Sequence, residues 1–327
     1  MSRLFRGKAP AAVFIGITGL LSFAAWKARI PLLLADRFLP GAGILEILLL
    51  ASYGTWIHSL LQDPRRAPAI RGRIWGLFSA VFFAQLALGL AGFERFLMTG
   101  ALHLPVPALI VGGPLYRGEG LFMPILYGTT LLLAGSAWCS HLCYIGAWDH
   151  ACAGSNNATR REYPAAAPWF RLITLTATVG LALGLRWIGA ARETAFAAAV
   201  TFSLGGIAVM LVLSRRMGRM MHCTAYCPIG LLSTVLGRLN PFRIRIAPTC
   251  DACGACSRSC RYGALDPEHL RRQDPGQTCT LCGDCLAACA RGNLGYAFPG
   301  LDRERARSLF LVIVVILHTV FLGVARI

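Results

Sequence analysis

Two similar runs of cysteine near the C-terminal end constrain this chain more than any other feature of its sequence. Each run has the spacing C-x₂-C-x₂-C-x₃-C, one from Cys250 to Cys260 and the other from Cys279 to Cys289, and together they hold eight of the thirteen cysteines. Three thiolates in a tight turn can reach three irons of one [4Fe–4S] cluster, while the fourth cysteine points away and completes the other cluster. The spacing therefore predicts two clusters that share their ligands crosswise.

The crosswise arrangement divides the eight cysteines into two sets of four. The first set is Cys250, Cys253, Cys256 and Cys289, and the second set is Cys279, Cys282, Cys285 and Cys260. Zinc is one alternative, although structural zinc sites use C-x₂-C pairs separated by a long spacer. Disulfides are another, although they are typical of secreted scaffolds, and these runs precede an apolar stretch long enough to cross a membrane.

The composition indicates an integral membrane protein. Hydrophobic residues make up 56% of the chain and charged residues only 14%, against roughly 25% charged residues in soluble domains. Apolar runs of about 20 residues, the length that crosses a bilayer, predict seven transmembrane helices. These spans are expected at 10–26, 42–61, 74–97, 121–138, 170–189, 195–213 and 308–325.

The basic residues indicate how the chain lies in the membrane. The net charge is +17, and most of the positive charges outside the cysteine runs fall on alternate loops, which face the cytoplasm by the positive-inside rule. We therefore expect a bacterial inner-membrane protein with a cytoplasmic N-terminus, cytoplasmic cysteine runs and a periplasmic C-terminus. Anionic lipid or an acidic redox partner then accounts for the charge without nucleic acid. The charges that set this orientation are Arg3, Arg6, Lys8, Arg65, Arg66, Arg71, Arg73, Arg160, Arg161, Arg215, Arg216 and Arg219.

Four more cysteines form two pairs that repeat each other 84 positions apart in the pattern C-x₃-C-x-I-G. Each pair follows a span that runs inward, so 74–146 and 170–230 predict a parallel structural repeat. Positions i and i+4 share one face of a helix, and each pair is therefore expected to present two thiolates to one site, which would hold an additional metal such as iron or zinc, or an iron–sulfur centre. Cysteines that merely pack in an apolar interior are the alternative. The pairs are Cys139 with Cys143 and Cys223 with Cys227.

Two other stretches predict local structure near these cysteines. Residues 239–246 alternate in polarity and favour a short strand, with which 295–298 could pair. The loop 99–120 is rich in proline and glycine and predicts no regular helix.

The arrangement resembles the NapH/NosR/MauN group of membrane polyferredoxins, which are 4Fe-4S ferredoxin-type integral membrane proteins. The likeness covers about 74–290, where a cysteine pair, two spans, a second pair and a two-cluster ferredoxin follow in the family's order. Proline is missing after three of the motifs, where Tyr144, Arg261 and Ala290 stand. The hairpin at 1–73 and the span at 308–325 are additions to the simplest members.

The resemblance implies a membrane-bound carrier that passes electrons between a quinol or a cytoplasmic donor and a partner redox protein. A maturation factor that supplies electrons or metal to a partner enzyme is an alternative, as is a docking subunit of a larger respiratory or photosynthetic complex. Neither haem nor flavin is expected, because the membrane histidines His58 and His318 lie at different depths and no flavin domain precedes the spans. An electron carrier is favoured over a stand-alone enzyme, since no nucleotide or nucleophile motif occurs.

The predicted fold is an all-α membrane protein of about seven transmembrane helices, with a small α+β two-[4Fe–4S] ferredoxin domain inserted before the last helix. The parts are an N-terminal hairpin (1–73), a membrane core with both cysteine pairs (74–230), the ferredoxin domain (231–300) and a C-terminal helix (301–327).

Overall fold

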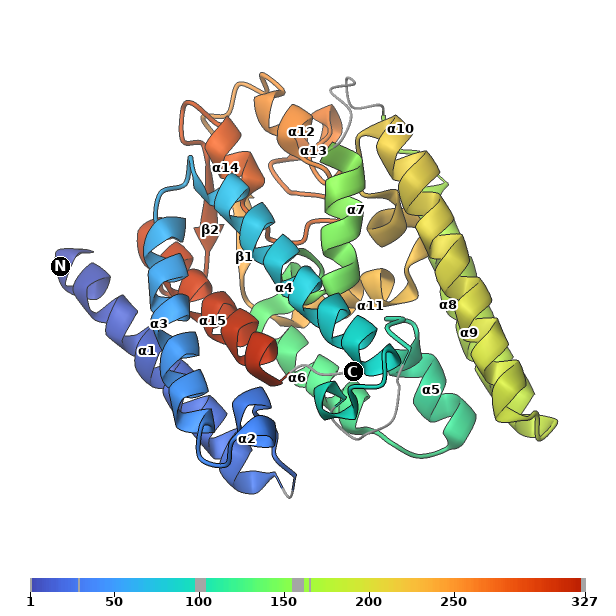
Figure 1. Ribbon diagram of the computed structural model, residues 1–327. Coiled ribbons are helices and arrows are strands. Elements are labelled where there is room, and N and C mark those ends of the chain that lie inside the picture. Colours follow the sequence, from blue (N-terminus) through green and yellow to red (C-terminus); the bar gives the residue numbers. More distant parts are fainter. Residues whose placement is uncertain (1, 29, 98–103, 155–161, 165, 325–327) are drawn as a thin grey trace.

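The computed structural model describes residues 2–28, 30–97, 104–154, 162–164 and 166–324, which are mostly helical (Figure 1). Seven helices of these ranges are long and apolar enough to cross a membrane, as the sequence predicted. They are α1 (Ser2–Lys27), α3 (Gly43–Leu61), α4 (Ala67–Leu90), α6 (Phe122–Ala134) with its continuation to Leu142, α8 (Ala167–Trp187), α9 (Arg192–Ala208) with its continuation to Met217, and α15 (Arg303–Val324).

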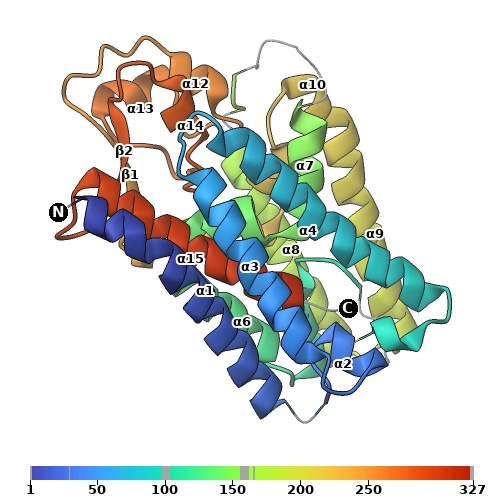
Figure 2. The same cartoon turned by 60° about the vertical axis from the view of Figure 1, so that its left-hand side comes forward.

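Helices α1, α3 and α15 pack side by side as one group (Figure 2). On α1, Val13, Ile17 and Leu21 are fully buried, and their spacing of four residues places them in one stripe of the helix. This stripe faces α3, from the N-terminal part of the chain, and α15, from its C-terminal end. The two ends are therefore joined in one bundle.

Helix α9 lies at one side of the molecule, and α8 precedes it in the chain (Figure 1). Much of their surface is apolar and uncovered, and Trp187 is 90% exposed. A soluble monomer rarely leaves a large apolar patch in water, whereas lipid tails are themselves apolar. These faces fit a bilayer. The large exposed side chains of α8 are Trp169, Phe170, Leu172, Ile173, Leu181, Leu183 and Trp187.

The cysteine-rich segment, residues 240–302, lies at one end of the helical bundle (Figures 1 and 2). Its strands β1 (Arg243–Ile246) and β2 (Leu294–Ala297) pair antiparallel, with Arg243 opposite Ala297, which confirms the predicted strand pair. Between the strands lie three short helices: α12 (Ala255–Ser259), α13 (Pro267–Arg272) and α14 (Asp284–Ala288).

The last helix anchors this segment to the bundle. The ring of Phe310 on α15 stacks on Tyr296 of β2 at 4.6 Å between centroids, and Phe242 beside β1 meets it edge-on at 5.4 Å. One turn earlier, the Arg307 guanidinium donates to the carbonyl oxygens of Leu61 and Gln62 at the end of α3, at 2.6 and 2.7 Å. The sheet, α15 and α3 are thus tied together at one place.

Shorter helices connect the spans, and two predictions of local structure were wrong. Helix α4 runs from Ala67 to Leu90 and not over 74–97, because Arg71 is buried inside the helix and not placed in a loop. The loop 99–120 does contain a helix, α5, which has Pro114 in its interior. Residues 325–327, expected on the periplasmic side, lie outside the described residues. The connecting helices are α2 (Leu34–Phe38), α5 (Leu109–Arg117), α7 (Tyr144–Gly154) and α11 (Pro228–Leu236), while α10 (Arg215–Met217) is the last turn of the span that begins with α9.

Candidate metal centres

The two cysteine runs fold into the same loop, whose shape comes from left-handed residues. The residue before the second cysteine has a φ of +52° at Ala252 and +54° at Leu281, and the glycine after that cysteine has +76° at Gly254 and +79° at Gly283. Helices α12 and α14 begin directly after these glycines. Left-handed residues in such turns point successive backbone N–H groups to one concave side, and loops of this kind bind iron–sulfur clusters and other anions.

The cysteine that ends each run also has equivalent surroundings in the two copies. Cys260 Sγ accepts a hydrogen bond from the backbone N–H of Ala264, and Cys289 Sγ accepts one from Asn293, both at 3.3 Å. Hydrogen bonds to a sulfur favour its thiolate form and affect the potential of a cluster that it binds. The two runs are therefore copies in conformation as well as in spacing.

The first set gathers thiols from both runs. Burial, together with the neighbouring thiols of Cys250 and Cys289, raises the pKa of Cys256 to about 11. Cys253 is exposed at the surface, while Cys250 and Cys289 are half-buried. The second run thus contributes Cys289 to the first set, and this set lies where another protein can approach it.

The second set also crosses between the runs, and it is more enclosed. Burial raises the pKa of Cys285, and the thiols of Cys282, Cys279 and Cys260 add to the shift. One cavity is lined by all four of these cysteines and closed on other sides by Ile244 and Tyr262 among others. Four thiols around one mostly apolar space fit the ligand set of an iron–sulfur cluster. The role of both sets as cluster ligands stays a prediction.

Each cysteine pair of the membrane core lies at a π-helical turn. The first turn (Trp138–Leu142) ends the span of α6, whereas the second (His222–Tyr226) follows the span of α9, which ends at Met217. The N–H of Cys143 donates to the carbonyl of Trp138 at 3.0 Å, and that of Cys227 donates to His222 at 2.7 Å. Both second cysteines have an extended backbone, with ψ of 113° and 120°, and α7 and α11 begin directly after them. The prediction that i and i+4 share one face of a regular helix was therefore wrong.

The glycine of the repeated C-x₃-C-x-I-G pattern permits a close backbone contact. A Cβ at Gly146 would lie 2.8 Å from the carbonyl oxygen of Cys139, and a Cβ at Gly230 would lie 2.4 Å from that of Cys223. A methyl group at either position would overlap the oxygen. The new helix in each copy can fold back against the π-helical turn only because this position has no side chain.

The two copies hold each other's first cysteine by a reciprocal contact. Asp149 of α7 accepts a hydrogen bond from the backbone N–H of Cys223 at 2.9 Å, and its carboxylate is also hydrogen-bonded to the Cys223 thiol. Ser233 of α11 is hydrogen-bonded to the thiol of Cys139. Asp149 and Ser233 stand 84 positions apart, the offset of the cysteine pairs themselves. The pairs thus meet about a local pseudo-twofold axis.

The four paired cysteines consequently lie together. Burial raises the pKa of Cys143, and the thiols of Cys139 and Cys227 contribute to the shift. Burial also raises the pKa of Cys223, with contributions from Asp149 and from the other three thiols. This group of four, the paired-cysteine site, is buried apart from Cys143, which is partly covered.

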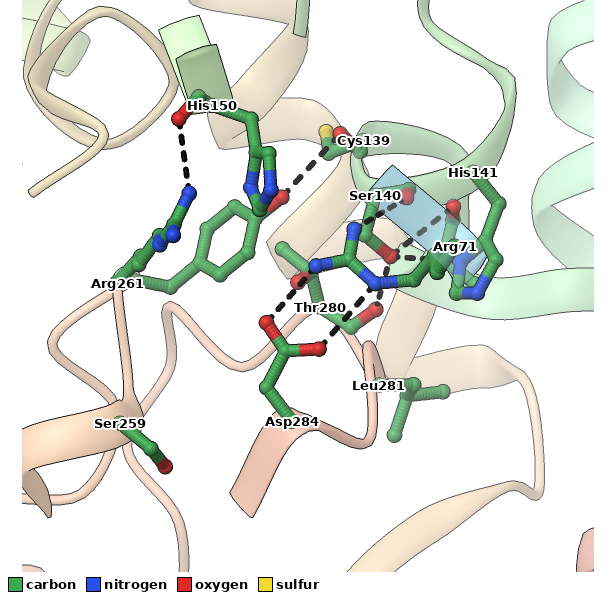
Figure 3. Close-up of polar contacts among 12 residues, drawn as sticks. Arg71, Cys139, Ser140, His141, His150, Ser259, Arg261, Thr280, Leu281 and Asp284 are labelled. Carbon is green, nitrogen blue, oxygen red and sulfur yellow. Dashed lines mark hydrogen bonds and ion pairs between the residues drawn. The ribbon is translucent and has the colours of Figure 1, made fainter. Parts of the chain in front are cut away.

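Hydrogen bonds join the paired-cysteine site to the second set (Figure 3). The Ser140 hydroxyl, between the first two paired cysteines, donates to the carbonyl of Thr280 at 2.8 Å. The Tyr262 hydroxyl donates to the Cys139 carbonyl at 3.4 Å, and Tyr262 also lines the cavity of the second set. The two sites are therefore neighbours across one layer of side chains.

Arg71 of α4 also links the paired-cysteine site to the second set. Its guanidinium donates to the carbonyl of Ser140 at 3.0 Å and to both carboxylate oxygens of Asp284, at 3.3 and 2.8 Å (Figure 3). Asp284 is the residue before Cys285. One buried arginine thus contacts both the first π-helical turn and the second cysteine run.

The arrangement of the thiols bears on the alternatives to iron–sulfur clusters. All thirteen cysteines lie in the described ranges, and each is a free thiol. In the part of the chain that the structure describes, no three side chains of His, Cys, Asp or Glu converge on one metal ion. Zinc requires four ligands at about 2.0–2.3 Å from one point. Zinc and disulfides stay alternative predictions for these cysteines.

Sequence reasoning missed the residues that surround the thiols. Arg71 was counted as a loop charge, and Asp284 lies within a cysteine run whose cysteines dominated the interpretation. Asp149 and Ser233 differ in type, so the shared offset of 84 positions was the only signal that could have linked them. Tyr262 follows the first run by two positions, and nothing in its sequence context indicates that it reaches Cys139.

Comparison with protein-family models, with curated proteins and with solved structures gives no match for this chain.

Proposed function

We propose that the chain is a membrane-bound iron–sulfur protein that passes electrons between a donor, a quinol or a cytoplasmic redox protein, and a partner redox protein. The observation that supports it most directly is the crosswise gathering of thiols from both runs, Cys250 and Cys256 with Cys289, and Cys279, Cys282 and Cys285 with Cys260. The two loops have left-handed residues at matching positions, and they lie at one end of seven apolar helices. In this proposal the cysteine-rich segment is a two-cluster ferredoxin domain, and each bound cluster takes up and releases one electron.

The surroundings of the two sets suit different roles in electron transfer. The first set suits exchange of electrons with a soluble partner, and the second set suits transfer inside the protein. The first set has Cys253 exposed, and its rim carries the ion pair of Arg291 and Asp251 at 2.9 Å on the surface. A soluble partner can therefore approach it closely. The second set is walled by Ile244 and Tyr262, which exclude water and hold it against the helical bundle. Electrons exchanged with a soluble protein would enter or leave at the first set.

Placement in the membrane follows from the helices and the charges. Seven apolar helices with uncovered faces require a lipid phase. The positive-inside rule puts the loop between α3 and α4 in the cytoplasm, and Pro64 of this loop lines a pocket together with Leu286 and Tyr296 of the cysteine-rich segment. We therefore propose that the segment lies on the cytoplasmic face of a bacterial inner membrane.

The proposal is tested on the full chain, purified anaerobically in detergent. We expect at least about eight irons and eight sulfides per chain and an EPR signal from reduced clusters upon addition of dithionite. Cys256→Ser should remove the first cluster and leave the second. Cys152→Ser is the matched control, since Cys152 lies on α7 outside the twelve site cysteines, and it should leave the spectrum unchanged.

Two results would overturn the proposal. One is protein with zinc in place of iron and without any reducible signal. The other comes from the cell: if deletion of the gene leaves the partner enzyme without its metal or cofactor, and not merely without electrons, the maturation role replaces the carrier role.

A further inference from the structure

We infer that the paired-cysteine site holds a third iron–sulfur cluster of the four-cysteine class, bound by Cys139, Cys143, Cys223 and Cys227 where the membrane helices meet the cysteine-rich segment. Its role as the next electron station after the second set rests on the proposed function. Its existence rests on the geometry of the site alone.

The site is built for ligands from both copies of the repeat. Each copy has a π-helical turn at or just beyond the end of its span, and each turn is followed by a helix whose glycine lies against the carbonyl of the first cysteine. The reciprocal hydrogen bonds, one from the Cys223 N–H to the Asp149 carboxylate and one between Ser233 and the Cys139 thiol, then fix the two turns against each other. Packing alone would not require four thiols at matched positions of both copies.

The two helix starts supply donors to the second cysteine of each pair. Backbone N–H groups of Ile145 and Gly146 point to Cys143, and those of Ile229 and Gly230 point to Cys227. The N-terminal end of a helix stabilises negative charge, including that of a thiolate. These donors oppose the rise in pKa that burial causes at both cysteines, and they would stabilise the charge of a metal-bound thiolate.

A buried cation without a carboxylate partner points to an anionic occupant. Arg171 on α8 is 3% exposed, and its charge acts on Cys139 and Cys227. Its Nη2 atom donates to the Thr234 hydroxyl at 3.0 Å, while its Nε atom is buried without a hydrogen-bond partner. Among the described residues no acid pairs with this arginine. An isolated buried charge is costly, and four metal-bound thiolates would offset it.

The paired-cysteine site resembles the two ferredoxin-type sets in the way its thiols act on one another. In each of the three groups, neighbouring thiols contribute to the pKa shift of a cysteine in the group. Four cysteines, one for each iron, are the ligand set of a [4Fe–4S] cluster.

The position of the site gives the transfer step. With clusters bound at both sites, one electron would pass from the second set to the paired-cysteine site. The donor cluster would be oxidised and the acceptor cluster reduced by one electron, with no covalent bond formed and no proton moved. Ser140 and Thr280, joined at 2.8 Å, and Tyr262, bonded to the Cys139 carbonyl, connect the two sites. Electrons would thereby pass from the cysteine-rich segment into the membrane part of the chain.

The test counts metal in the full chain. We expect about twelve irons per chain and a third one-electron component in an EPR redox titration. The double variant Cys223→Ala/Cys227→Ala should lose about four irons and the third component, while the signals of the first two clusters remain. Cys152→Ala is the matched control and should retain all three.

The outcomes separate this inference from the proposed function. About eight irons in the unaltered chain, or stoichiometric zinc or copper that the double variant loses, would overturn the third cluster and leave the carrier proposal intact. Absence of iron would overturn both. If the double variant does not accumulate, Ser233→Ala keeps every ligand and removes a hydrogen bond to the Cys139 sulfur. It should lower the potential of one component only, and unchanged potentials would contradict the inference.

Discussion

Arg71 and Asp284 form a buried ion pair, 2.8 Å between Nη2 and Oδ2, although 213 positions separate them in the chain. The pair joins the helix α4 to the helix that carries Cys285. The same guanidinium stacks over Trp75 at 5.3 Å and reaches the carbonyl of Ser140. The second cysteine run is therefore fastened to the membrane helices by a polar contact that water does not reach.

We expect Arg71→Met to destabilise the protein by about 3–5 kcal/mol, because it leaves the Asp284 carboxylate buried without a partner. The double variant Arg71→Met/Asp284→Leu should recover most of this loss. The midpoint of thermal bleaching of the cluster absorbance in detergent measures the effect. Arg66→Met is the control, since its pair with Asp63 is exposed and a change there stays within about 0.5 kcal/mol. Equal midpoints for Arg71→Met and Arg66→Met would contradict the role of the pair.

Removing the charge of Arg71 and removing the charge of Asp284 should shift the reduction potential of the second cluster in opposite directions. Burial and the Asp284 carboxylate raise the pKa of the Cys282 thiol, and the Arg71 guanidinium opposes them. Reduction adds negative charge to a cluster. Arg71→Met should therefore lower its reduction potential, and Asp284→Asn should raise it, as an EPR redox titration would show. Shifts of the same sign would indicate a general loss of structure and not an electrostatic effect.

Gly230→Ala should disrupt the paired-cysteine site. The new Cβ would lie 2.4 Å from the Cys223 carbonyl oxygen and would force α11 away from the π-helical turn. We expect a loss of stability of about 1–3 kcal/mol and a loss of the iron assigned to this site. Gly128→Ala in α6 is the matched control, because nothing lies within 4 Å of its Cβ. Alanine there should be neutral or stabilising by about 1 kcal/mol. Similar yields and iron contents for the two variants would refute the close contact.

Asp266 caps helix α13, and its contribution to the stability of this helix should decrease only at acidic pH. Partial burial alone would raise the pKa of Asp266, but hydrogen bonds from the His269 backbone N–H, at 2.8 Å, and from its ring hold it below the usual value. Since the folded pKa lies below the unfolded value of about 3.9, the stabilisation is complete above about pH 4 and is lost as the pH falls through the folded pKa.

Hydrogen exchange of the α13 amides measures this effect. Protection corrected for intrinsic exchange should stay constant from pH 7 to 5 and fall only below about pH 4. Asp266→Ala should reduce the local stability by about 1 kcal/mol at pH 7, whereas Asp266→Asn keeps an acceptor and should reduce it less. A fall in the protection of α13 between pH 7 and 5 in the unaltered chain would contradict the assignment.

The left-handed residues of the two loops differ in burial, so glycine should affect them differently. Ala252 is exposed, and glycine removes the cost of the left-handed conformation, about 1–2 kcal/mol. Leu281 is only 4% exposed, and glycine there also removes a buried side chain that contributes about 2–5 kcal/mol. Ala252→Gly should therefore raise the temperature of cluster loss, and Leu281→Gly should lower it. A drop of the same size in both variants would contradict the conformations of these loops.

Spacing and hydropathy were enough to predict much of this fold. The seven spans follow from runs of apolar residues, and the pairing of β1 with β2 follows from alternation near Ile244 and the aromatic residues near Tyr296. These signals are local. The start of α4 was misplaced because a buried Arg71 looks like a loop residue until its partner Asp284 is known, and that partner is distant in sequence.

The candidate sites were partly predictable for the same reason. Cysteine spacing identified all twelve thiols, and the repeat of 84 positions indicated that the two pairs would be related. The π-helical turns were not foreseen, because a spacing of four residues is typical of a regular helix. The exchange of partners between Asp149 and Ser233 depends on how the copies pack, and one copy alone gives no sign of it.

The anchoring of the cysteine-rich segment by α15 decides how it can serve a partner. Phe310 stacks on Tyr296, and Arg307 closes the end of α3. A segment tied at both ends and clamped in this way has no freedom to swing between distant docking positions. In the proposed function it would be a stationary relay, and any shuttling between donor and acceptor would be left to the proteins or quinols that come to it.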